Sequence, residues 1–252
     1  MVTYQDRTEF KPDSLMIVIA RTVSAMFAAA VATDPTRPLL TYYDDSSGER
    51  TELSGATLTN WVAKTANMIA DDCGLGIGNR AAVGLPPHWQ SAAVLLGCWT
   101  AGLDVVTAPD PAEVAFVFVA AANHDWPAAE RYALGLHPMG LPLRAVPDGY
   151  LDFNTEVRAH GDHFYPAAPV SPGDPALGGR TNESVCADGA ARADALGLRG
   201  GRVLIDADTH PDPLDWLLAP LAAGSSIVLC RNLDEAKIGG RAAAERVTQQ
   251  LI

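Results

Sequence analysis

The chain contains 252 residues, 48% of them hydrophobic, and its formal net charge is −12 at pH 7. This length and apolar content supply the core of one large α/β domain or of two small ones. The acidic balance, without a basic stripe, argues against nucleic acid and against anionic membranes as partners.

The N-terminal region predicts an extension followed by a helix. Residues 1–20 form the expected extension, and residues 15–32 (LMIVIARTVSAMFAAAVA) resemble the apolar part of a secretory signal. Arg21 interrupts that run and acidic residues precede it, so we predict neither a signal peptide nor a membrane span. We expect instead an amphipathic helix over residues 23–33, which ends before Asp34 because a following proline disfavours the helical conformation.

The four cysteines, Cys73, Cys98, Cys186 and Cys230, lie far apart in the sequence and form no CxxC pair. Three of them stand inside apolar helix or strand patterns. This usage is typical of buried reduced thiols and indicates a cytoplasmic protein.

A glycine run at residues 74–78 (GLGIG) has the wrong context for a dinucleotide site. Before it, residues 39–43 predict a strand, residues 44–48 a turn, and Ser54 caps an amphipathic helix that continues to Cys73. The run therefore follows a helix and opens a strand. A phosphate-binding glycine loop has the opposite order, since it opens a helix whose N–H groups face the anion.

One stretch of the chain occurs twice, because residues 78–110 align without a gap on residues 200–232. The matched pairs include Gly78 with Gly200, Arg80 with Arg202, His88 with His210 and Gly102 with Gly224. Each copy reads as a strand, an amphipathic helix, a glycine that ends the helix and a second strand, which predicts two parallel βαβ units. With the helices before them, the copies cover about residues 54–110 and 181–232. We expect residues 21–252 to form a single α/β domain in which helices cover a mostly parallel sheet or a pair of stacked sheets.

The region between the copies is less regular, and residues 138–175 form a connector rich in proline, glycine and aspartate. The remaining expected elements are a strand over residues 114–120, a short helix over 127–134, a strand near 133–136, a helical turn near 152–159, a helix over 181–196 and a final helix over 234–252.

Acidic and histidine side chains gather where the strand at residues 202–207 should end, the edge at which open α/β sheets bind ligands. They are Asp206, Asp208, His210, Asp212 and Asp215. Carboxylates coordinate hard cations, but this spacing also suits helix capping and a solvated loop, so we predict no metal site here. His160 and His163 lack third and fourth ligands for zinc, and we expect them to be solvated loop residues.

Four motifs resemble the opening of the adenylate-forming superfamily, which includes acyl-CoA synthetases, peptide-synthetase adenylation domains and luciferase. They are residues 52–61 (ELSGATLTNW), 74–83 (GLGIGNRAAV), 85–89 (LPPHW) and 101–106 (AGLDVV). The second copy is similar to a later segment of the same family, and the whole chain resembles short actinobacterial relatives of unassigned activity. The resemblance implies the fold of the front part of that family's large domain.

The family's phosphate-gripping loop, Ser/Thr-Ser-Gly-Thr-Thr-Gly-x-Pro-Lys-Gly, should lie just before the helix at residue 181. Residues 171–181 read SPGDPALGGRT, which keeps two glycines but loses the threonine pair and the lysine. Asp174 also adds negative charge where a triphosphate needs donors. The family's later catalytic motifs would lie beyond Ile252. The resemblance therefore implies no catalytic residues here and no ATP, AMP or CoA cofactor.

The resemblance also supplies candidate substrate-binding residues. His210 falls on a position that faces the acyl substrate in the family, and Asp208, Arg180 and Thr181 stand near the same expected edge. The alternative for His210 is a loop histidine hydrogen-bonded to a neighbouring aspartate. We predict a catalytically inactive relative of the AMP-binding synthetases that binds a small molecule or a protein. The alternatives are a divergent ligase-like enzyme that handles acyl or CoA substrates, and a structural subunit of a homo-oligomer or another assembly.

Overall fold

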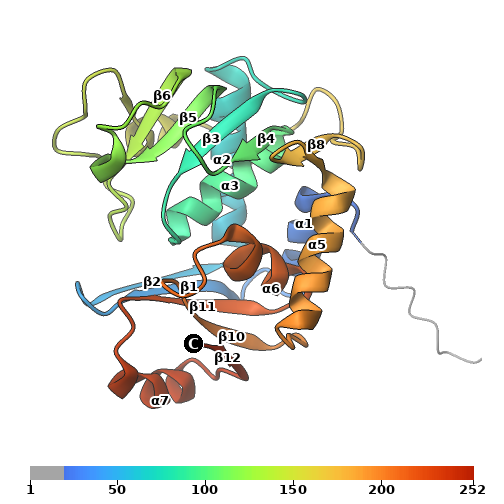
Figure 1. Ribbon diagram of the computed structural model, residues 1–252, viewed down its shortest axis with the longest axis vertical. Helices are drawn as coiled ribbons and strands as arrows, with labels where there is room; N and C mark the ends of the chain where they lie inside the picture. The colour runs from blue at the N-terminus through green and yellow to red at the C-terminus, as the bar shows by residue number, and fades with distance from the viewer. Residues whose placement is uncertain (1–19) are drawn as a thin grey trace, which may run out of the picture.

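Two β-sheets are stacked with helices between them, as the computed structural model of residues 20–252 shows (Figure 1). The seven-stranded sheet has the order β7 (Leu151–Asp152), β6 (Ala128–Leu134), β5 (Ala112–Phe118), β3 (Arg80–Gly84), β4 (Asp104–Val106), β8 (Pro175–Leu177) and β9 (Arg180–Thr181). The five-stranded sheet has the order β12 (Gln249–Leu251), β10 (Arg202–Asp206), β11 (Ser226–Arg231), β1 (Pro38–Asp44) and β2 (Glu49–Ser54). Among these described strands, only the β1–β2 and β8–β9 pairs are antiparallel.

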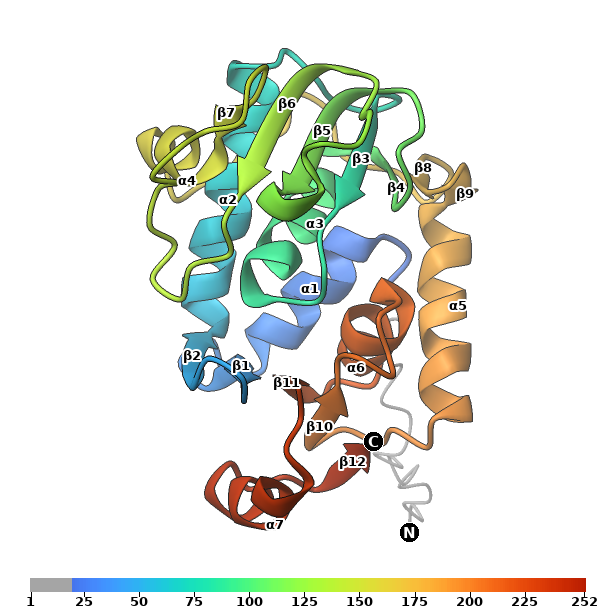
Figure 2. The ribbon, with the colours of Figure 1, turned by 60° about the vertical axis from the view of Figure 1, so that its left-hand side comes forward.

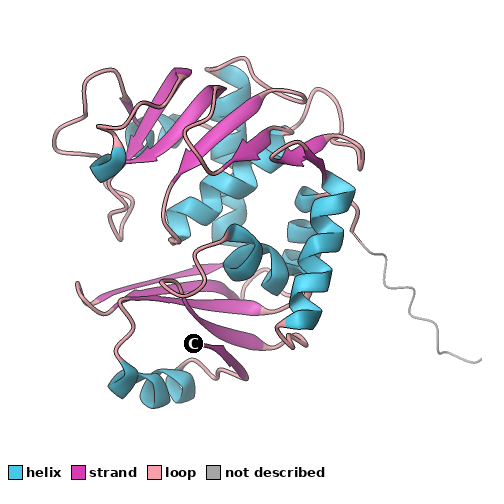
Figure 3. Cartoon of the chain, in the orientation of Figure 1, coloured by secondary structure: helices cyan, strands magenta, loops and turns pink. Residues whose placement is uncertain are grey.

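The helices fill the space between the two sheets and cover one outer face (Figure 3). The inner group is α1 (Val23–Ala32), α2 (Gly55–Asp71), α3 (Trp89–Ala101) and α6 (Ala219–Ala222), which follows a π-helical turn, η3 (Leu214–Leu218). α5 (Asn182–Ala195) runs along one side, and α7 (Glu235–Ala244) lies on the outer face of the five-stranded sheet. The short elements are α4 (Phe153–Glu156), η1 (Val119–Ala121) and η2 (Val157–Ala159). The predicted fold class, mostly parallel sheets covered by helices, is confirmed.

The two similar stretches form strand–helix–strand units in different sheets (Figure 2). In the first unit, β3 and β4 flank α3 and pair in parallel. In the second unit, β10 and β11 flank η3 and α6 and also pair in parallel. Gly102 and Gly224, at φ +89° and +68°, adopt the left-handed conformation just after each helix, which is why glycine ends both helices.

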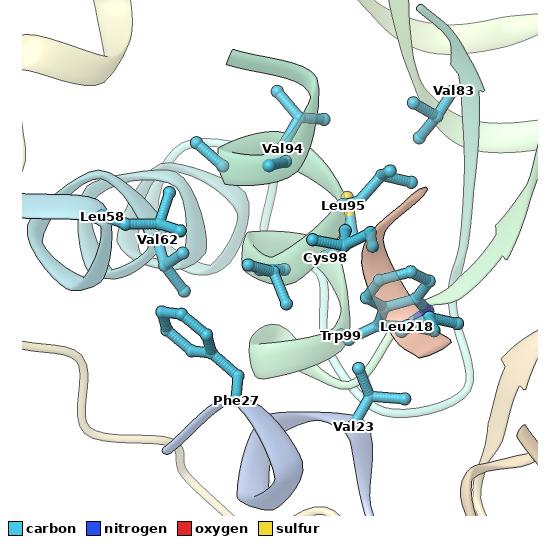
Figure 4. Close-up of a cluster of buried hydrophobic side chains, with 14 of the residues drawn as sticks. Val23, Phe27, Leu58, Val62, Val83, Val94, Leu95, Cys98, Trp99 and Leu218 are labelled. Atoms are coloured by element: carbon cyan, nitrogen blue, oxygen red, sulfur yellow. The ribbon is translucent and has the colours of Figure 1, made fainter. Parts of the chain in front are cut away.

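The main core lies between the sheets, where side chains of α1, α2, α3 and η3 meet (Figure 4). Phe27, Val62, Trp99 and Leu218 come from these four elements and are each at most 5% exposed. α3 is buried on all sides from Trp89 to Trp99, because it is enclosed by other elements rather than facing solvent. The shared core ties the two sheets into one packed structure.

Residues 127–134 were expected to be a helix, and this prediction was wrong. β6 runs over Ala128–Leu134 and pairs in parallel with β5 and β7. The Tyr132 ring stacks on Phe116 of β5, with ring centroids 5.5 Å apart, and Tyr132 is buried. Cross-strand packing of this kind outweighs the helix propensity of the two alanines and the glutamate at the start of the segment.

The final helix was also expected to be longer than it is. α7 ends at Ala244, Arg246 takes a left-handed backbone conformation (φ +54°), and β12 then pairs with β10. Of the apolar residues expected on one helix, 242 and 243 lie on α7, 247 lies in the connection and 251 lies on β12. The helices expected at residues 23–33, 54–73 and 181–196 are confirmed, whereas strands β2, β7, β8 and β9 had no sequence prediction. The expected extension, residues 1–20, lies outside the described residues except for Ala20.

All four cysteines are free thiols. Burial raises the pKa of Cys186 and of Cys230 to about 11, so both stay protonated near neutral pH. Within residues 20–252, no helix combines the length and apolar character required to cross a membrane.

Candidate functional site

A cleft of about 600 Å³ opens at the carboxyl ends of strands from both sheets. One wall consists of residues 83–87, at the end of β3, and the other of Ala207, Asp208 and residues 211–213, which follow β10. The cleft therefore lies between corresponding loops of the two strand–helix–strand units. Loops at this edge of α/β sheets are the usual place for ligands.

The cleft is mostly apolar with a few polar groups, as ligand pockets usually are. Its apolar lining includes Val83, Leu85, Leu95, Phe118 and several prolines. The charged side chains are Asp208, Asp212 and Arg231.

The carboxylates of the cleft accept hydrogen bonds from backbone amides, one in their own loop and one just after β11. Asp208 Oδ2 accepts the Asn232 N–H at 2.7 Å, and Asp212 Oδ1 accepts the Leu214 N–H at 2.8 Å. Arg231 Nε lies 4.0 Å from Asp208 Oδ1, and the Arg231 side chain is 36% exposed. The guanidinium of Arg231 is the one cationic group among the residues that line the cleft, and it lies beside Asp208 and near the Tyr42 hydroxyl.

Of the four predicted site residues, Asp208 lines the cleft and His210 does not. His210 Nδ1 lies 3.4 Å from Asp215 Oδ2, and Asp215 accepts two hydrogen bonds from the Arg192 guanidinium at 2.6 and 2.9 Å. The hydrogen bonds from Arg192 lower the pKa of Asp215 below its ordinary value, and burial opposes them. This arrangement matches the alternative considered for His210, a loop histidine beside an aspartate.

The other two predicted residues lie near a smaller pocket of about 330 Å³, which shares Thr107, Asp212 and Pro213 with the cleft. Arg180 lines this pocket and forms an ion pair with Asp188 at 2.8 Å. Thr181 lines neither pocket, because its hydroxyl caps α5 by accepting the Ser184 N–H. The structure thus brings Asp208 and Arg180 to neighbouring pockets and leaves His210 and Thr181 outside them.

The segment expected to hold a phosphate loop is a tight hairpin. β8 and β9 pair through the two-residue turn Gly178-Gly179, whose φ values of +59° and +78° are those of a type I′ turn. The Gly178 N–H donates to the Val105 carbonyl at 2.9 Å. The Gly179 N–H donates to the Asp104 carboxylate, at 2.9 and 3.1 Å to its two oxygens. Both glycine amides are therefore already occupied.

Asp104 is well placed to hold this hairpin. Its side chain is 6% exposed, and Oδ2 also lies 3.3 Å from Arg80 Nε. The neighbouring turn is closed by Asp174, whose carboxylate accepts the Ser171 N–H at 2.7 Å. Backbone N–H groups at residues 171 and 179 of this segment thus each donate to a carboxylate, that of Asp174 and that of Asp104.

His88 is a buried polar residue near the cleft for which the sequence predicted no role. It caps α3, since Nδ1 accepts the Gln90 N–H at 3.1 Å, while Nε2 lies 3.4 Å from Glu49 Oε1. Its ring packs edge-on against Tyr42, and burial lowers the pKa of His88 despite the nearby carboxylate. Its position between Pro87 and an apolar helical pattern was the signal that could have identified a cap.

No metal site is apparent in the described region, because no group of three or more His, Cys, Asp or Glu side chains in residues 20–252 is arranged to hold an ion. The expectation that His160 is solvated was wrong. Its side chain is 10% exposed, and Nε2 lies 2.9 Å from Asp72 Oδ2, so it fastens the connector to the end of α2. His163 is exposed, as expected.

The comparisons with known proteins agree with this architecture. No family model matches the chain. A Mycobacterium tuberculosis protein described as "TIGR03089 family protein" is 44% identical over 228 residues, which is 86% of this chain and 93% of that protein.

Solved structures with a similar fold include acyl-CoA synthetases. The Brucella canis acyl-CoA synthetase has a TM-score of 0.72 at 20% identity, with 90% of this chain and 46% of that chain covered. The N-terminal domain of FACL13 from M. tuberculosis has a TM-score of 0.68 at 14% identity, with 91% and 62% covered. The acetoacetyl-CoA synthetase from Streptomyces lividans has a TM-score of 0.64 at 18% identity, with 91% and 42% covered. The chain spans about half the length of these enzymes, and it belongs to the TIGR03089 protein family, with the fold of the N-terminal region of the adenylate-forming superfamily.

Proposed function

We propose that this chain binds a small organic acid in the cleft and does not activate it with ATP in the manner of the acyl-CoA synthetases. The observation that carries the proposal is the hairpin at residues 175–181. A phosphate site needs free N–H donors and positive charge. Here the Gly178 and Gly179 amides already donate to Val105 and Asp104, and a carboxylate stands where a phosphate oxygen would have to accept.

The cleft supports binding because it has free volume for a ligand, whereas the amides of the hairpin are already hydrogen-bonded. Its volume of about 600 Å³ is within the range of small-molecule sites, roughly 300–1,000 Å³. Leu85 and Phe118 offer an apolar surface, and Arg231 offers a planar guanidinium suited to a carboxylate. The structural neighbours are named for acyl substrates, which makes an acid with an apolar body the first class to test.

The test is isothermal titration calorimetry with straight-chain and aromatic carboxylic acids of increasing size. We expect at least one acid to bind saturably, and Arg231→Ala to weaken that acid at least about tenfold because a charge-assisted hydrogen bond is lost. Arg199→Ala is the matched control. Arg199 forms an exposed ion pair with Asp194 and does not line the cleft.

Two outcomes would count against the proposal. Equal binding by Arg231→Ala and Arg199→Ala would show that the acid does not use the cleft. Acid-dependent exchange of pyrophosphate into ATP would favour the alternative of a divergent ligase-like enzyme.

A further inference from the structure

A second hollow, of about 570 Å³, lies on the five-stranded sheet, toward the amino ends of its parallel strands. Four arginines line it, and they come from different parts of the fold: Arg37 precedes β1, Arg50 is on β2, Arg202 begins β10 and Arg246 follows α7. We call this site the arginine hollow. The cleft lies at the opposite, carboxyl ends of β10 and β11, so the two sites are separate.

The arginine hollow has a surplus of positive charge in an acidic protein. Its four guanidiniums face only two carboxylates, those of Glu52 and Glu245, whereas the whole chain has a net charge of −12. Glu245 pairs with both Arg50 and Arg202, and Glu52 pairs with Arg50. Arg37 and Arg246 form no ion pair with any residue in the described range 20–252. The hollow thus has two guanidiniums that are held in no ion pair, and the charge nearest to Arg37 outside the hollow is that of the exposed Asp34 carboxylate.

The two paired arginines are held in place before any ligand arrives. Arg202 donates to the Pro38 carbonyl, to the Thr41 hydroxyl and to Glu245, at 3.1, 2.7 and 2.8 Å. Arg50 donates to the Tyr43 hydroxyl at 2.9 Å and to Glu245. Fixed donors lose little side-chain entropy when a ligand binds.

The hydrogen bonding of the hollow is also incomplete. The Nε–H groups of Arg37 and Arg202 are buried and have no acceptor among the described residues. Buried donors are nearly always satisfied in proteins, by protein groups, water or an ion. These covered Nε–H groups do not face the open hollow, so it is the surplus charge that points toward an acceptor carrying negative charge.

We propose that the arginine hollow binds a dianionic oxyanion of the phosphate or phosphate-monoester class. Two unpaired guanidiniums match two negative charges, and guanidinium groups pair with phosphate oxygens through parallel hydrogen bonds. The phosphoryl group is the recognised part, whether it is free phosphate or the end of a larger molecule.

The experiment is isothermal titration calorimetry with inorganic phosphate at pH 7.5, at ionic strength held constant with sodium chloride. We expect saturable binding that weakens at least about tenfold in the double variant Arg37→Gln/Arg246→Gln, because two charge-assisted contacts are lost. This variant should fold, since neither arginine has an ion-pair partner to leave behind. Arg144→Gln/Arg199→Gln removes the same charge elsewhere and should bind like the wild type. At pH 5.5, where phosphate is mostly a monoanion, binding should weaken.

Further titrations test whether a phosphate monoester binds as free phosphate does, and whether phosphate binds in the arginine hollow or in the cleft. Glycerol phosphate should bind and glycerol should not, and Arg231→Ala in the cleft should leave phosphate binding unchanged. The proposal is overturned if wild-type protein shows no saturable phosphate binding, or if the two double variants weaken it equally. Either result leaves the proposal for the cleft untouched.

Discussion

The two strand–helix–strand units have similar sequences but contribute differently to the molecule. The corresponding histidines illustrate the contrast. His88 in the first unit is 2% exposed, caps α3 and packs on Tyr42, whereas His210 in the second unit is 19% exposed and lies beside Asp215. The same residue type is part of the core in one unit and of a surface ion-pair network in the other.

The helix of the first unit is also longer and more regular than that of the second. α3 is a regular helix of 13 residues, buried between the sheets. In the second unit, a π-helical turn precedes the four-residue α6, which contains Pro220. Proline has no N–H and its ring crowds the preceding turn, so the chain widens there, and the Ala219 N–H reaches the Leu214 carbonyl.

The two units also contribute different kinds of side chain to the cleft. All of its charged side chains, Asp208, Asp212 and Arg231, come from the second unit, while the first unit supplies apolar residues such as Val83 and Leu85. The comparison teaches that the first unit mainly stabilises the fold and the second unit mainly determines what the cleft can bind.

The largest expected effect is a stability difference between the two histidine variants. His88→Ala should lower the free energy of unfolding by about 3 kcal/mol, because it removes a helix cap and leaves a cavity beside Tyr42. His210→Ala should cost less than about 1 kcal/mol, since the side chain is partly exposed. Urea unfolding measures both values, and equal losses would contradict the division of roles.

A pair of helix glycines gives the next largest effect. A Cβ at Gly97 of α3 would lie 2.5 Å from the Thr65 side chain of α2, so Gly97→Ala should cost about 2 kcal/mol by forcing the helices apart. A Cβ at Gly189 of α5 would meet its nearest atom at 3.5 Å, so Gly189→Ala should be neutral or stabilise by about 0.5–1 kcal/mol through helix propensity. Destabilisation by Gly189→Ala of the same size would contradict the tighter packing assigned to the first unit.

Acid should destabilise the two units in different pH windows. Burial lowers the pKa of His88, so the unfolded chain binds the proton more readily and stability should fall as pH drops below about 6.5. The pKa of Asp215 is lowered mainly by Arg192, so its contribution is present above about pH 4 and is lost as pH falls further. Unfolding curves between pH 3 and pH 8 should lose the first step in His88→Asn, which keeps a capping side chain. The second step should become smaller in Asp215→Asn without disappearing, because the pKa values of Asp45 and Glu245 are also lowered, each to about 2. A wild-type profile that is flat between pH 5 and pH 7 would rule out the contribution of His88.

The smallest expected effect concerns the charge balance of the cleft. Asp208→Asn removes the carboxylate nearest Arg231, so an acid that binds there should bind about threefold more tightly. Titration calorimetry with the acid identified for the wild type measures the change. Weaker binding by this variant would indicate that Asp208 contacts the ligand as an acceptor.

Much of the fold could be predicted from the sequence, because the strands around α3 and η3 have apolar runs that end in turn residues. The hairpin of β8 and β9 could not, since each strand is too short to show a pattern. The site was only partly predictable. Asp208 and the strand edge follow from chain order, but Arg231 closes an apolar strand and joins the cleft only through tertiary packing. The arginine hollow unites residues 37, 50, 202 and 246, which no local pattern connects.

The central claim is that the Gly178-Gly179 turn is closed to phosphate, and amide NMR tests it most directly. Magnesium ATP is titrated into the ¹⁵N-labelled Arg37→Gln/Arg246→Gln variant, so that binding in the arginine hollow does not interfere. The account predicts that the Gly178 and Gly179 amide resonances keep their positions and their protection from hydrogen exchange, because Val105 and Asp104 hold these N–H groups. Saturable shifts of both amides with ATP would contradict it.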